Sequence, residues 1–401
     1  MANPPPPDLL RRLEDRLGPE GYTTGAAEMA PWLVDWRGRY RGAAAAMLSP
    51  ATTEEVADVV RLCSEAGTAI VPQGGNSSMA GGATPDSGGG ALLLSMRRMN
   101  RIRSVSPEAN LAVCEAGVIL SNLHDAAGAA GRRFPLSLGA KGSATVGGLV
   151  STNAGGTQVL RFGTMRGLVA GLEAVLPDGS RYEGLRALKK DNRGYDLKQL
   201  LIGAEGTLGI VTAASLKLVP RIGARAVAWI GLASPDDALV LLRAIEARPA
   251  EAVESFELVP QSALDLVLAH VPGTRRPLEC SHMWHVLVEA TAPEGGPDPS
   301  NMLAAALEEA MERGLAQDAV LASSEAQAEA FWKIRDSISE AEQKDGPAAK
   351  HDVSVEVEAM PRFIEEAAGA VEARFAGARV IAFGHLGDGN VHFNVRAPLG
   401  A

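Results

Sequence analysis

The sequence predicts a mixed α+β protein of two or three domains, and three observations support that prediction. Its 401 residues fit that number at roughly 100–200 residues per domain. Hydrophobic residues make up 46% of the chain and charged residues 21%, as in globular proteins that bury a core. Helical and strand-like segments alternate, and their character changes near Pro220. We therefore expect a domain boundary close to that residue.

The first half of the chain combines short strands with glycine-rich loops. The T-x-x-E pattern from Thr52 to Glu55 is a capping box, and apolar residues follow it at helical spacing. This predicts a helix over residues 53–66 that stops at Gly67. The other predicted elements of this half are strands at 68–72, 91–95, 111–118 and 172–176 and a helix at 119–130.

Beyond Pro220, helical runs rich in Ala, Glu and Leu alternate with strands. Helices are predicted at 236–247 and 300–313 and strands at 255–258 and 284–289. Near the end, GHLGDGNVHFN (384–394) predicts a strand, a turn and a second strand. That geometry can bring two imidazoles, His385 and His392, close together.

Charge and cysteine content argue against several classes of protein. The chain has 38 Lys and Arg against 48 Asp and Glu, a net charge of −10, which disfavours a nucleic-acid partner. Three cysteines without C-x-x-C spacing indicate reduced thiols. The start lacks a signal-peptide pattern, and no apolar run approaches the roughly 18 residues of a membrane span. We therefore expect a cytoplasmic protein without a membrane span, with a disordered Pro-rich lead.

Glycine is unusually frequent and unevenly placed. The chain holds 44 glycines, about 11% against roughly 7% on average, and half of them lie in residues 74–90 and 139–209. The loop Gly74-Gly75-Asn76-Ser77 follows a strand and can aim several N–H groups at one anion, although a tight surface loop explains it equally well. Residues 137–156 interleave Gly, Ser, Thr and Asn. Backbone with few Cβ atoms can wrap around a long anionic or heteroaromatic ligand.

Four segments carry a resemblance to a known family: residues 71–86, 134–156, 161–179 and 188–218. They resemble the FAD-binding half of the vanillyl-alcohol-oxidase (PCMH-type) flavoproteins and are most similar to its D-2-hydroxyglutarate and D-lactate dehydrogenase branch. The resemblance implies a PCMH-type FAD-binding domain of two α/β subdomains, followed by an α+β cap domain with an antiparallel sheet. It implies a lead segment at 1–36, the FAD domain at 37–220 and the substrate-binding cap at 221–401.

The resemblance also implies a set of FAD contacts. Asn76 stands where members with covalently linked flavin have His, so the FAD is expected to be non-covalent. Ser78 stands where this branch usually has Gly, and a positive φ there would strain the loop. The expected contact residues are Pro72, Gln73, Gly74, Gly75, Asn76, Ser77, Ser143, Gly147, Gly148, Asn153, Gly155, Glu205, Gly209 and Ile210.

The same resemblance implies roles in substrate and metal binding for several polar residues in the second half of the chain. Arg335 and Ser339, four residues apart on one predicted helix face, and Lys350 would hold the carboxylates of a small D-2-hydroxy acid. His385 and His392 would bind a divalent metal, zinc; the family's third ligand is a Glu downstream of this motif, which these 401 residues do not contain. Asn394 would orient the substrate, and His351 would support Lys350. Without the resemblance, a solvated Arg, a loop Lys and a structural His pair explain these residues better.

The implied function is FAD-linked oxidation of a small 2-hydroxycarboxylate by hydride transfer to flavin N5. The substrate would be of D-2-hydroxyglutarate or D-lactate type. An electron-transfer flavoprotein or quinone would accept the electrons. A homodimer is one assembly that the sequence allows. The alternative is a non-catalytic or accessory flavin-binding protein, inactive because the family's C-terminal active-site segment lies beyond residue 401. In either case the strand that ends near Pro398 is expected to lack neighbours.

Overall fold

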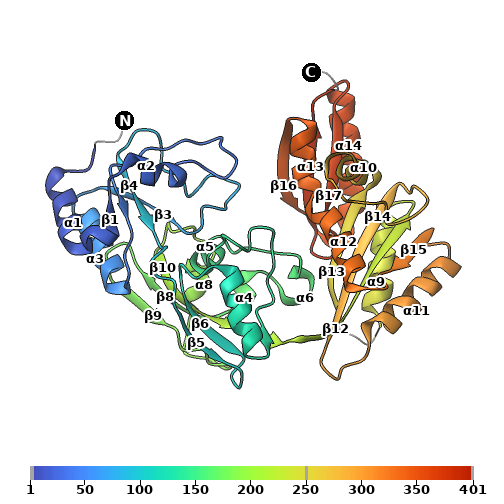
Figure 1. The fold of residues 1–401 in the computed structure, drawn as a ribbon, viewed down its shortest axis with the longest axis horizontal. Helices are drawn as coiled ribbons and strands as arrows, with labels where there is room; N and C mark the ends of the chain where they lie inside the picture. The colour runs from blue at the N-terminus through green and yellow to red at the C-terminus, as the bar shows by residue number, and fades with distance from the viewer. Residues whose placement is uncertain (1–3, 249–251, 399–401) are drawn as a thin grey trace. The chain divides into compact units, whose positions relative to one another are not determined.

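The chain divides into two compact units (Figure 1). The computed structural model describes residues 4–248 and 252–398. Unit 1 comprises residues 4–156 and 163–221, and unit 2 comprises 157–162 and the described residues from 222 onward. In the described ranges no helix is both long enough and apolar enough to cross a membrane.

A helix forms within residues 1–36, the expected lead segment. α1 (Pro7–Gly21) has proline at its start, a position where the missing N–H costs nothing. Leu9, Leu13 and Leu17 repeat every four residues and are buried in the same core as α3 (Thr53–Glu65). This leucine stripe follows the proline tract, and residues 1–3 lie outside the described part, so disorder of the Pro-rich start stays a prediction.

Unit 1 contains two main sheets. The first has the order β1 (Tyr22–Thr23), β2 (Met47–Leu48), β4 (Ala91–Ser95), β3 (Ala69–Gln73), with β4 parallel to both β2 and β3. The second is antiparallel, with the order β5 (Ile102–Ser106), β6 (Leu111–Glu115), β10 (Ile210–Lys217), β8 (Val169–Val175), β9 (Arg181–Gly184). A short pair joins β7 (Arg132–Arg133) to β11 (Val219–Pro220).

The helices of unit 1 follow the sequence signals closely. The Thr52 hydroxyl accepts from the Glu55 N–H at 3.2 Å, and Gly67 has φ +63°, which confirms the predicted start and stop of α3. α4 (Leu120–Ala129) closes at a left-handed Gly131, also as predicted. The remaining helices are α2 (Ala26–Met29), the 3₁₀ turn η1 (Ala30–Trp32), α5 (Val146–Ser151), α7 (Met165–Leu168) and α8 (Lys198–Leu201).

Unit 2 is built on one seven-stranded antiparallel sheet, which confirms the expected cap architecture. Its order is β15 (Asp318–Leu321), β12 (Ile222–Leu232), β14 (Trp284–Pro293), β13 (Val253–Pro260), β17 (Arg379–His385), β18 (Asn390–Arg396), β16 (Ala348–Ser354). The strand–turn–strand predicted over 384–394 is β17 and β18. β18 lies between β17 and β16, so the expectation that it lacks neighbours is wrong. β16, from earlier in the chain, pairs along its whole length.

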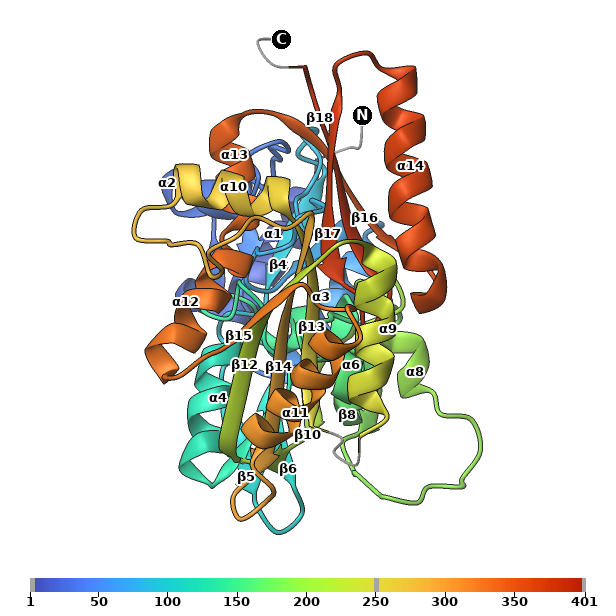
Figure 2. The ribbon, with the colours of Figure 1, turned by 90° about the vertical axis from the view of Figure 1, so that its right-hand side faces the viewer.

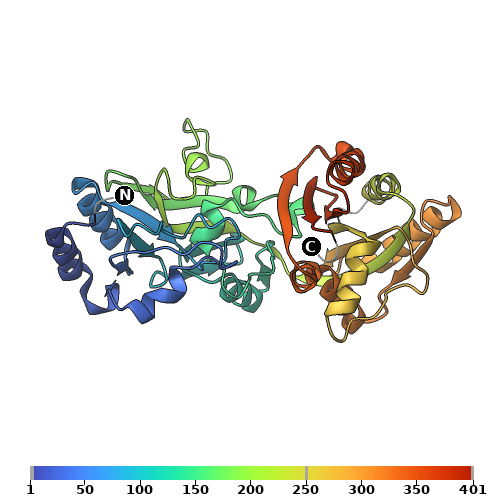
Figure 3. The ribbon, with the colours of Figure 1, turned by 90° about the horizontal axis from the view of Figure 1, so that it is seen from above.

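Helices cover both faces of this sheet (Figures 2 and 3). One face packs against α9 (Pro235–Glu246), α11 (Pro299–Glu312) and α14 (Met360–Arg374), around Phe256 and Phe393. The other packs against α10 (Gln261–His270), α12 (Glu325–Asp336) and α13 (Ile338–Asp345), around Trp229 and Phe383. Because successive strand residues alternate between faces, each strand contributes to both cores.

A short segment from the first half of the chain belongs to unit 2. Residues 157–162 include α6 (Val159–Phe162), which lies against β13. The Arg161 guanidinium donates to the buried Glu254 carboxylate at 3.0 Å and to the Thr291 hydroxyl at 3.1 Å. The Ser255 hydroxyl donates to the Thr157 carbonyl at 2.7 Å. These contacts hold residues 157–162 against the sheet of unit 2.

Candidate functional site

Unit 1 contains a cavity of about 280 Å³ lined by the glycine-rich loops. Glu205 is the only charged residue in its lining, so an anion held there would be bound by backbone N–H groups. Ser143, Asn153 and Gly155 are not in the lining. The other expected contact residues do line it: Pro72, Gln73, Gly74, Gly75, Asn76, Ser77, Gly147, Gly148, Glu205, Gly209 and Ile210.

Close packing between the two glycine regions explains part of the glycine requirement. A Cβ on Gly75 would overlap the carbonyl oxygen of Ser143, and one on Gly74 would overlap the hydroxyl of Thr145. Ser143 therefore contacts the first loop with its backbone rather than the cavity with its side chain. Replacement of either glycine would push these loops apart.

Three expected contact residues have strained backbone. Asn76, Asn153 and Glu205 have φ near +50°, and they are three of the four non-glycine residues with positive φ in the described ranges. The Asn76 amide donates to the Val34 carbonyl at 2.8 Å, and the Asn153 side-chain oxygen accepts from the Arg166 N–H at 2.9 Å. Ser78 is absent from this set, so the strain expected there is not found.

Two buried polar atoms of the cavity lining have no partner among the described residues: Gln73 Oε1 and Thr145 Oγ1. The Gln73 amide nitrogen donates to the carbonyls of Trp32 and Ala83 at 3.0 and 2.8 Å, which fixes the direction of its oxygen. Buried polar atoms are nearly always hydrogen-bonded. A ligand with polar groups at these positions would satisfy both.

In unit 2, strand register brings the predicted polar residues onto one face of the sheet. Lys350 of β16 is opposite Asn394 of β18, and Asp352 is opposite His392. His392 is in turn opposite Phe383 of β17, and two residues further along β17 lies His385. Alternate residues share a face, so these side chains lie on the face that α12 and α13 cover.

His351 lies on the other face of β16. It is opposite Phe393, which belongs to the core formed with α9, α11 and α14. Its ring nitrogen Nδ1 is 3.0 Å from the Phe393 carbonyl oxygen. The expectation that His351 supports Lys350 is therefore wrong, because neighbours along a strand point to opposite sides.

Arg335 of α12 and His385 share a buried carboxylate, that of Glu257 on β13. Both Nε and Nη2 of Arg335 are 2.8 Å from Glu257 Oε2. Nδ1 of His385 is 2.6 Å from the other oxygen, Oε1. Burial alone would raise the pKa of Glu257, but Arg335 and His385 outweigh it and lower the pKa to about 2. The carboxylate is therefore ionised at neutral pH.

Lys350 and Asn394 share a second buried carboxylate, that of Glu342 on α13. Its Oε2 accepts from Lys350 Nζ at 3.3 Å and from the Asn394 amide at 2.7 Å. Burial raises the pKa of Glu342 despite the charge of Lys350, and its Oε1 has no partner among the described residues. Sequence reasoning missed both glutamates. The signal was present in Glu257, an acid within the apolar strand VESFELVP.

Ser339 does not share a helix face with Arg335 as predicted. α12 ends at Asp336 and α13 begins at Ile338, with Ser337 capping both. Serine competes for backbone hydrogen bonds and favours such helix ends. Ser339 is exposed, and it is its carbonyl oxygen, not its hydroxyl, that lies 3.4 Å from Lys350 Nζ.

The expected zinc site is not supported. The rings of His385 and His392 are 5.5 Å apart, but Nδ1 of each faces a carboxylate, that of Glu257 or Asp352. Nε2 of His385 faces the Arg335 guanidinium at 3.4 Å. The described part of the chain contains no group of three His, Cys, Asp or Glu that could hold a metal. A catalytic zinc usually has three protein ligands, and these residues supply two imidazoles.

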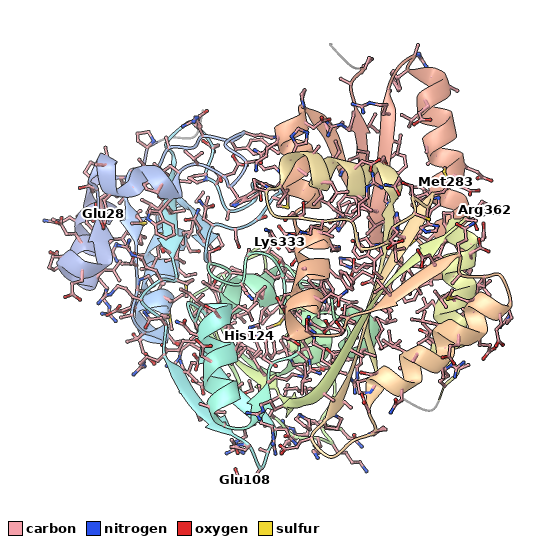
Figure 4. The ribbon with its side chains drawn as sticks, turned by 45° about the vertical axis from the view of Figure 1, so that its right-hand side comes forward. Glu28, Glu108, His124, Met283, Lys333 and Arg362 are labelled. Atoms are coloured by element: carbon pink, nitrogen blue, oxygen red, sulfur yellow. The ribbon has the colours of Figure 1, made fainter. Side chains whose placement is uncertain are left out.

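Other histidines serve the fold. His124 lies on α4 (Figure 4), where Nε2 is 2.9 Å from the Leu136 carbonyl. His285 lies between the Trp229 indole and the Gln261 amide, at 3.1 and 2.9 Å. Burial lowers the pKa of His285 to about 4, so this ring is neutral at pH 7.

Comparison with known proteins gives two family matches. Residues 44–184 match the family described as FAD binding domain, and residues 223–400 match FAD linked oxidases, C-terminal domain. The fold is similar to that of alkyldihydroxyacetonephosphate synthase, with a TM-score of 0.78 and 18% identity over 98% of this chain and 79% of that one. It is also similar to p-cresol methylhydroxylase, with a TM-score of 0.73 and 14% identity over 98% of this chain and 82% of that one.

Curated relatives are considerably closer in sequence. The chain is 40% identical to the mitochondrial D-2-hydroxyglutarate dehydrogenase of Arabidopsis thaliana, over 91% of this chain and 64% of that protein. It is 40% identical to the Bos taurus enzyme of the same name, over 97% and 70%. It is 35% identical to a putative mitochondrial D-lactate dehydrogenase of Schizosaccharomyces pombe, over 93% and 72%. The chain thus spans 64–72% of the length of these relatives.

These names contradict the expected cytoplasmic location, because all three relatives are named as mitochondrial proteins. Sparse, unpaired cysteines cannot distinguish one reducing compartment from another, which is why the inference failed. The antiparallel cap sheet, the glycine-lined cavity and the two family matches agree with the sequence relatives. The chain belongs to the D-2-hydroxyglutarate dehydrogenase branch of the PCMH-type FAD-binding flavoproteins.

Proposed function

We propose that this protein oxidises a small D-2-hydroxy acid, of D-2-hydroxyglutarate or D-lactate type, to the 2-oxo acid. The observation that carries the proposal is the sheet face of unit 2 where Arg335 and Lys350 gather with two imidazoles. Guanidinium and ammonium groups bind carboxylates, and an imidazole can accept a hydroxyl proton. The names of the relatives support this class of substrate.

The cavity of unit 1 would hold FAD. Its lining fits that cofactor because the N–H groups of residues 74–77 can bind the pyrophosphate and Glu205 can accept from ribose hydroxyls. The unpartnered oxygens of Gln73 and Thr145 offer further hydrogen bonds. FAD, when bound, supplies the flavin ring that accepts hydride. The engaged amide of Asn76, in place of a linking His, supports a dissociable cofactor.

Residues of unit 2 would bind and deprotonate the substrate. Arg335 and Lys350 hold carboxylate, and the two cations allow either a mono- or a dicarboxylate. Nε2 of His385 has a lone pair when Nδ1 donates to Glu257. Arg335 Nη2 faces this lone pair at 3.4 Å, and the lone pair can take the hydroxyl proton once the substrate hydroxyl replaces that contact. The C2–H bond then breaks as a hydride, the C–O bond becomes a carbonyl, and the proton stays on the imidazole. No step is assigned to a metal.

Electrons must then leave the reduced protein. We propose an electron-transfer flavoprotein or a quinone as the acceptor, because the sequence offers no dinucleotide-binding G-x-G-x-x-G motif for a nicotinamide.

The test is anaerobic mixing of the FAD-loaded protein with D-2-hydroxyglutarate, D-lactate and their L enantiomers. Loss of flavin absorbance with a D acid and not with its L form is the expected result. If no D-2-hydroxy acid bleaches the flavin, the proposal is wrong and a non-catalytic flavin-binding role takes its place.

A further inference from the structure

Glu257 is an ionisable residue in a strand that is otherwise built for packing. It is 1% exposed, and its neighbours Phe256 and Leu258 are buried in the core on the opposite face. Removing a carboxylate from water costs several kcal/mol unless it is paired and hydrogen-bonded. An apolar residue would fill this place in the sheet at lower cost. The position therefore points to a role beyond packing.

Both oxygens of Glu257 are fully used, each by a different partner. Oε2 accepts twice from Arg335 of α12, and Oε1 accepts once from His385 of β17, directly opposite in the strand register. Arg335 and His385 are 50 residues apart in sequence, and both contact this carboxylate. We infer that Glu257 is the positioning residue that sets the orientation of both the carboxylate-binding Arg335 and the proton-accepting His385. This inference rests on the proposed function.

Contact with Glu257 fixes which nitrogen of His385 carries hydrogen. An ionised carboxylate only accepts, so at 2.6 Å the ring nitrogen Nδ1 must be the donor. On the other side of the ring, Nη2 of Arg335 is 3.4 Å from Nε2, and a guanidinium only donates. The two contacts select the same tautomer, in which Nδ1–H faces Glu257 and the Nε2 lone pair faces Arg335.

The same carboxylate limits how Arg335 can bind a substrate. Its Nε and Nη2 are committed to Glu257, and its central carbon lies over the Phe383 ring, 5.8 Å from the ring centroid. A guanidinium has five donors, so the hydrogens of Nη1 remain for a carboxylate. Glu257 thus holds the guanidinium so that its Nε–Nη2 edge faces the protein and Nη1 stays available.

The test compares three variants of the full FAD-loaded chain. Glu257→Gln keeps the size of the side chain but replaces one acceptor with an NH₂ group, so it cannot accept from both partners. Glu257→Asp keeps the charge with a shorter reach. Glu289→Gln is the matched control, because Glu289 is also buried in this sheet, pairs with Arg225 and accepts from Trp332, yet lies outside the site.

Two measurements separate positioning from general loss of structure. Nitrogen-15 spectra of the histidine rings report the tautomer of His385 without any substrate. Calorimetric titration of the oxidised protein with 2-oxoglutarate, the product of D-2-hydroxyglutarate oxidation, reports carboxylate binding without turnover.

For Glu257→Gln we expect Kd for 2-oxoglutarate to rise about 10- to 100-fold and the His385 ring to switch to the Nε2–H tautomer. Glu257→Asp should keep the wild-type tautomer and recover part of the affinity, and Glu289→Gln should match wild type in both. An Nε2–H tautomer in the wild-type protein, wild-type affinity in Glu257→Gln, or an equal loss in Glu289→Gln would overturn the inference. Because the His385 tautomer is measured in the wild-type protein, the inference can be overturned even if a variant does not fold. Failure of the proposed function has a separate signature, the absence of flavin bleaching by any D-2-hydroxy acid.

Discussion

Single residues of unit 2 show that its cations are held in place by carboxylates before any substrate binds. Arg335 pairs with Glu257, and Lys350 pairs with Glu342. The side chains of both glutamates are at most 1% exposed, so neither pair is screened by water. A guanidinium has five N–H donors and can bind its glutamate and a substrate at the same time. An ammonium has only three N–H donors to share between the two.

Arg335→Lys should therefore weaken substrate binding although the charge is kept. Lysine cannot donate twice to Glu257 and still present a planar edge to a carboxylate, so we expect KM for the D-2-hydroxy acid to rise about tenfold or more. Lys333→Ala is the control, because Lys333 lies on the same helix (Figure 4) and its ammonium donates to the Pro272 carbonyl at 3.1 Å. Steady-state kinetics measure both variants, and an unchanged KM in Arg335→Lys would contradict the assignment.

Among the secondary structure elements, an ion-pair network joins the antiparallel sheet of unit 1 to α3. Glu115 of β6 accepts from Arg101 and Arg103, and Glu173 of β8 accepts from Arg103 and from the hydroxyls of Thr53 and Thr212. Burial would raise the pKa of each carboxyl, but these hydrogen bonds and charges outweigh it and lower both. The network thus needs ionised carboxylates.

Stability of unit 1 should consequently fall in acid. A carboxyl whose pKa is lower in the folded state contributes stability above its unfolded pKa of about 4.3, and that contribution is lost as pH falls through the folded value. Glu115→Gln should lower the free energy of unfolding by roughly 2 kcal/mol at pH 7, with a gap to wild type that shrinks as pH falls below about 4. Urea unfolding at several pH values measures this, and a gap independent of pH would refute it.

Elements with local signals were predictable, and contacts between distant segments were not. A few neighbouring residues determine each of three features: the capping box of α3, the left-handed glycine after α4 and the β17–β18 turn. The register that puts Lys350 opposite Asn394, and so on the same face as His392, depends on pairing with a strand some 40 residues later. Glu257 was missed for the same reason, since its partners are 78 and 128 residues away.

For the whole molecule, the division into two units separates the glycine-lined cavity from the polar face of the cap. All residues lining the cavity belong to unit 1, and all residues of the Arg335 and Lys350 clusters belong to unit 2. Each unit has a core of its own. Multidomain chains of this kind commonly unfold in more than one step.

Addition of FAD to the apoprotein should raise one thermal transition. A ligand at 100 times its Kd adds about 2.7 kcal/mol, which corresponds to roughly 5–10 °C for a unit of this size. Gly75→Ala should lose that shift, because its Cβ would overlap the Ser143 carbonyl and open the loops that line the cavity. Differential scanning calorimetry with and without FAD measures it, and an equal shift in wild type and Gly75→Ala would contradict the assigned cavity.

The assignment of residues 157–162 to unit 2 has a consequence for the exchange of domains between related proteins. The chain passes between the units at three places, after residues 156, 162 and 221. The residues of unit 2 are therefore not encoded by one continuous segment of the gene. A transplant that begins at Ile222 would leave behind the Arg161 side chain that contacts Glu254 and Thr291. Swapping cap domains among relatives, in evolution or in the laboratory, would thus require two coordinated insertions, and recombinants made with a single crossover should be selected against.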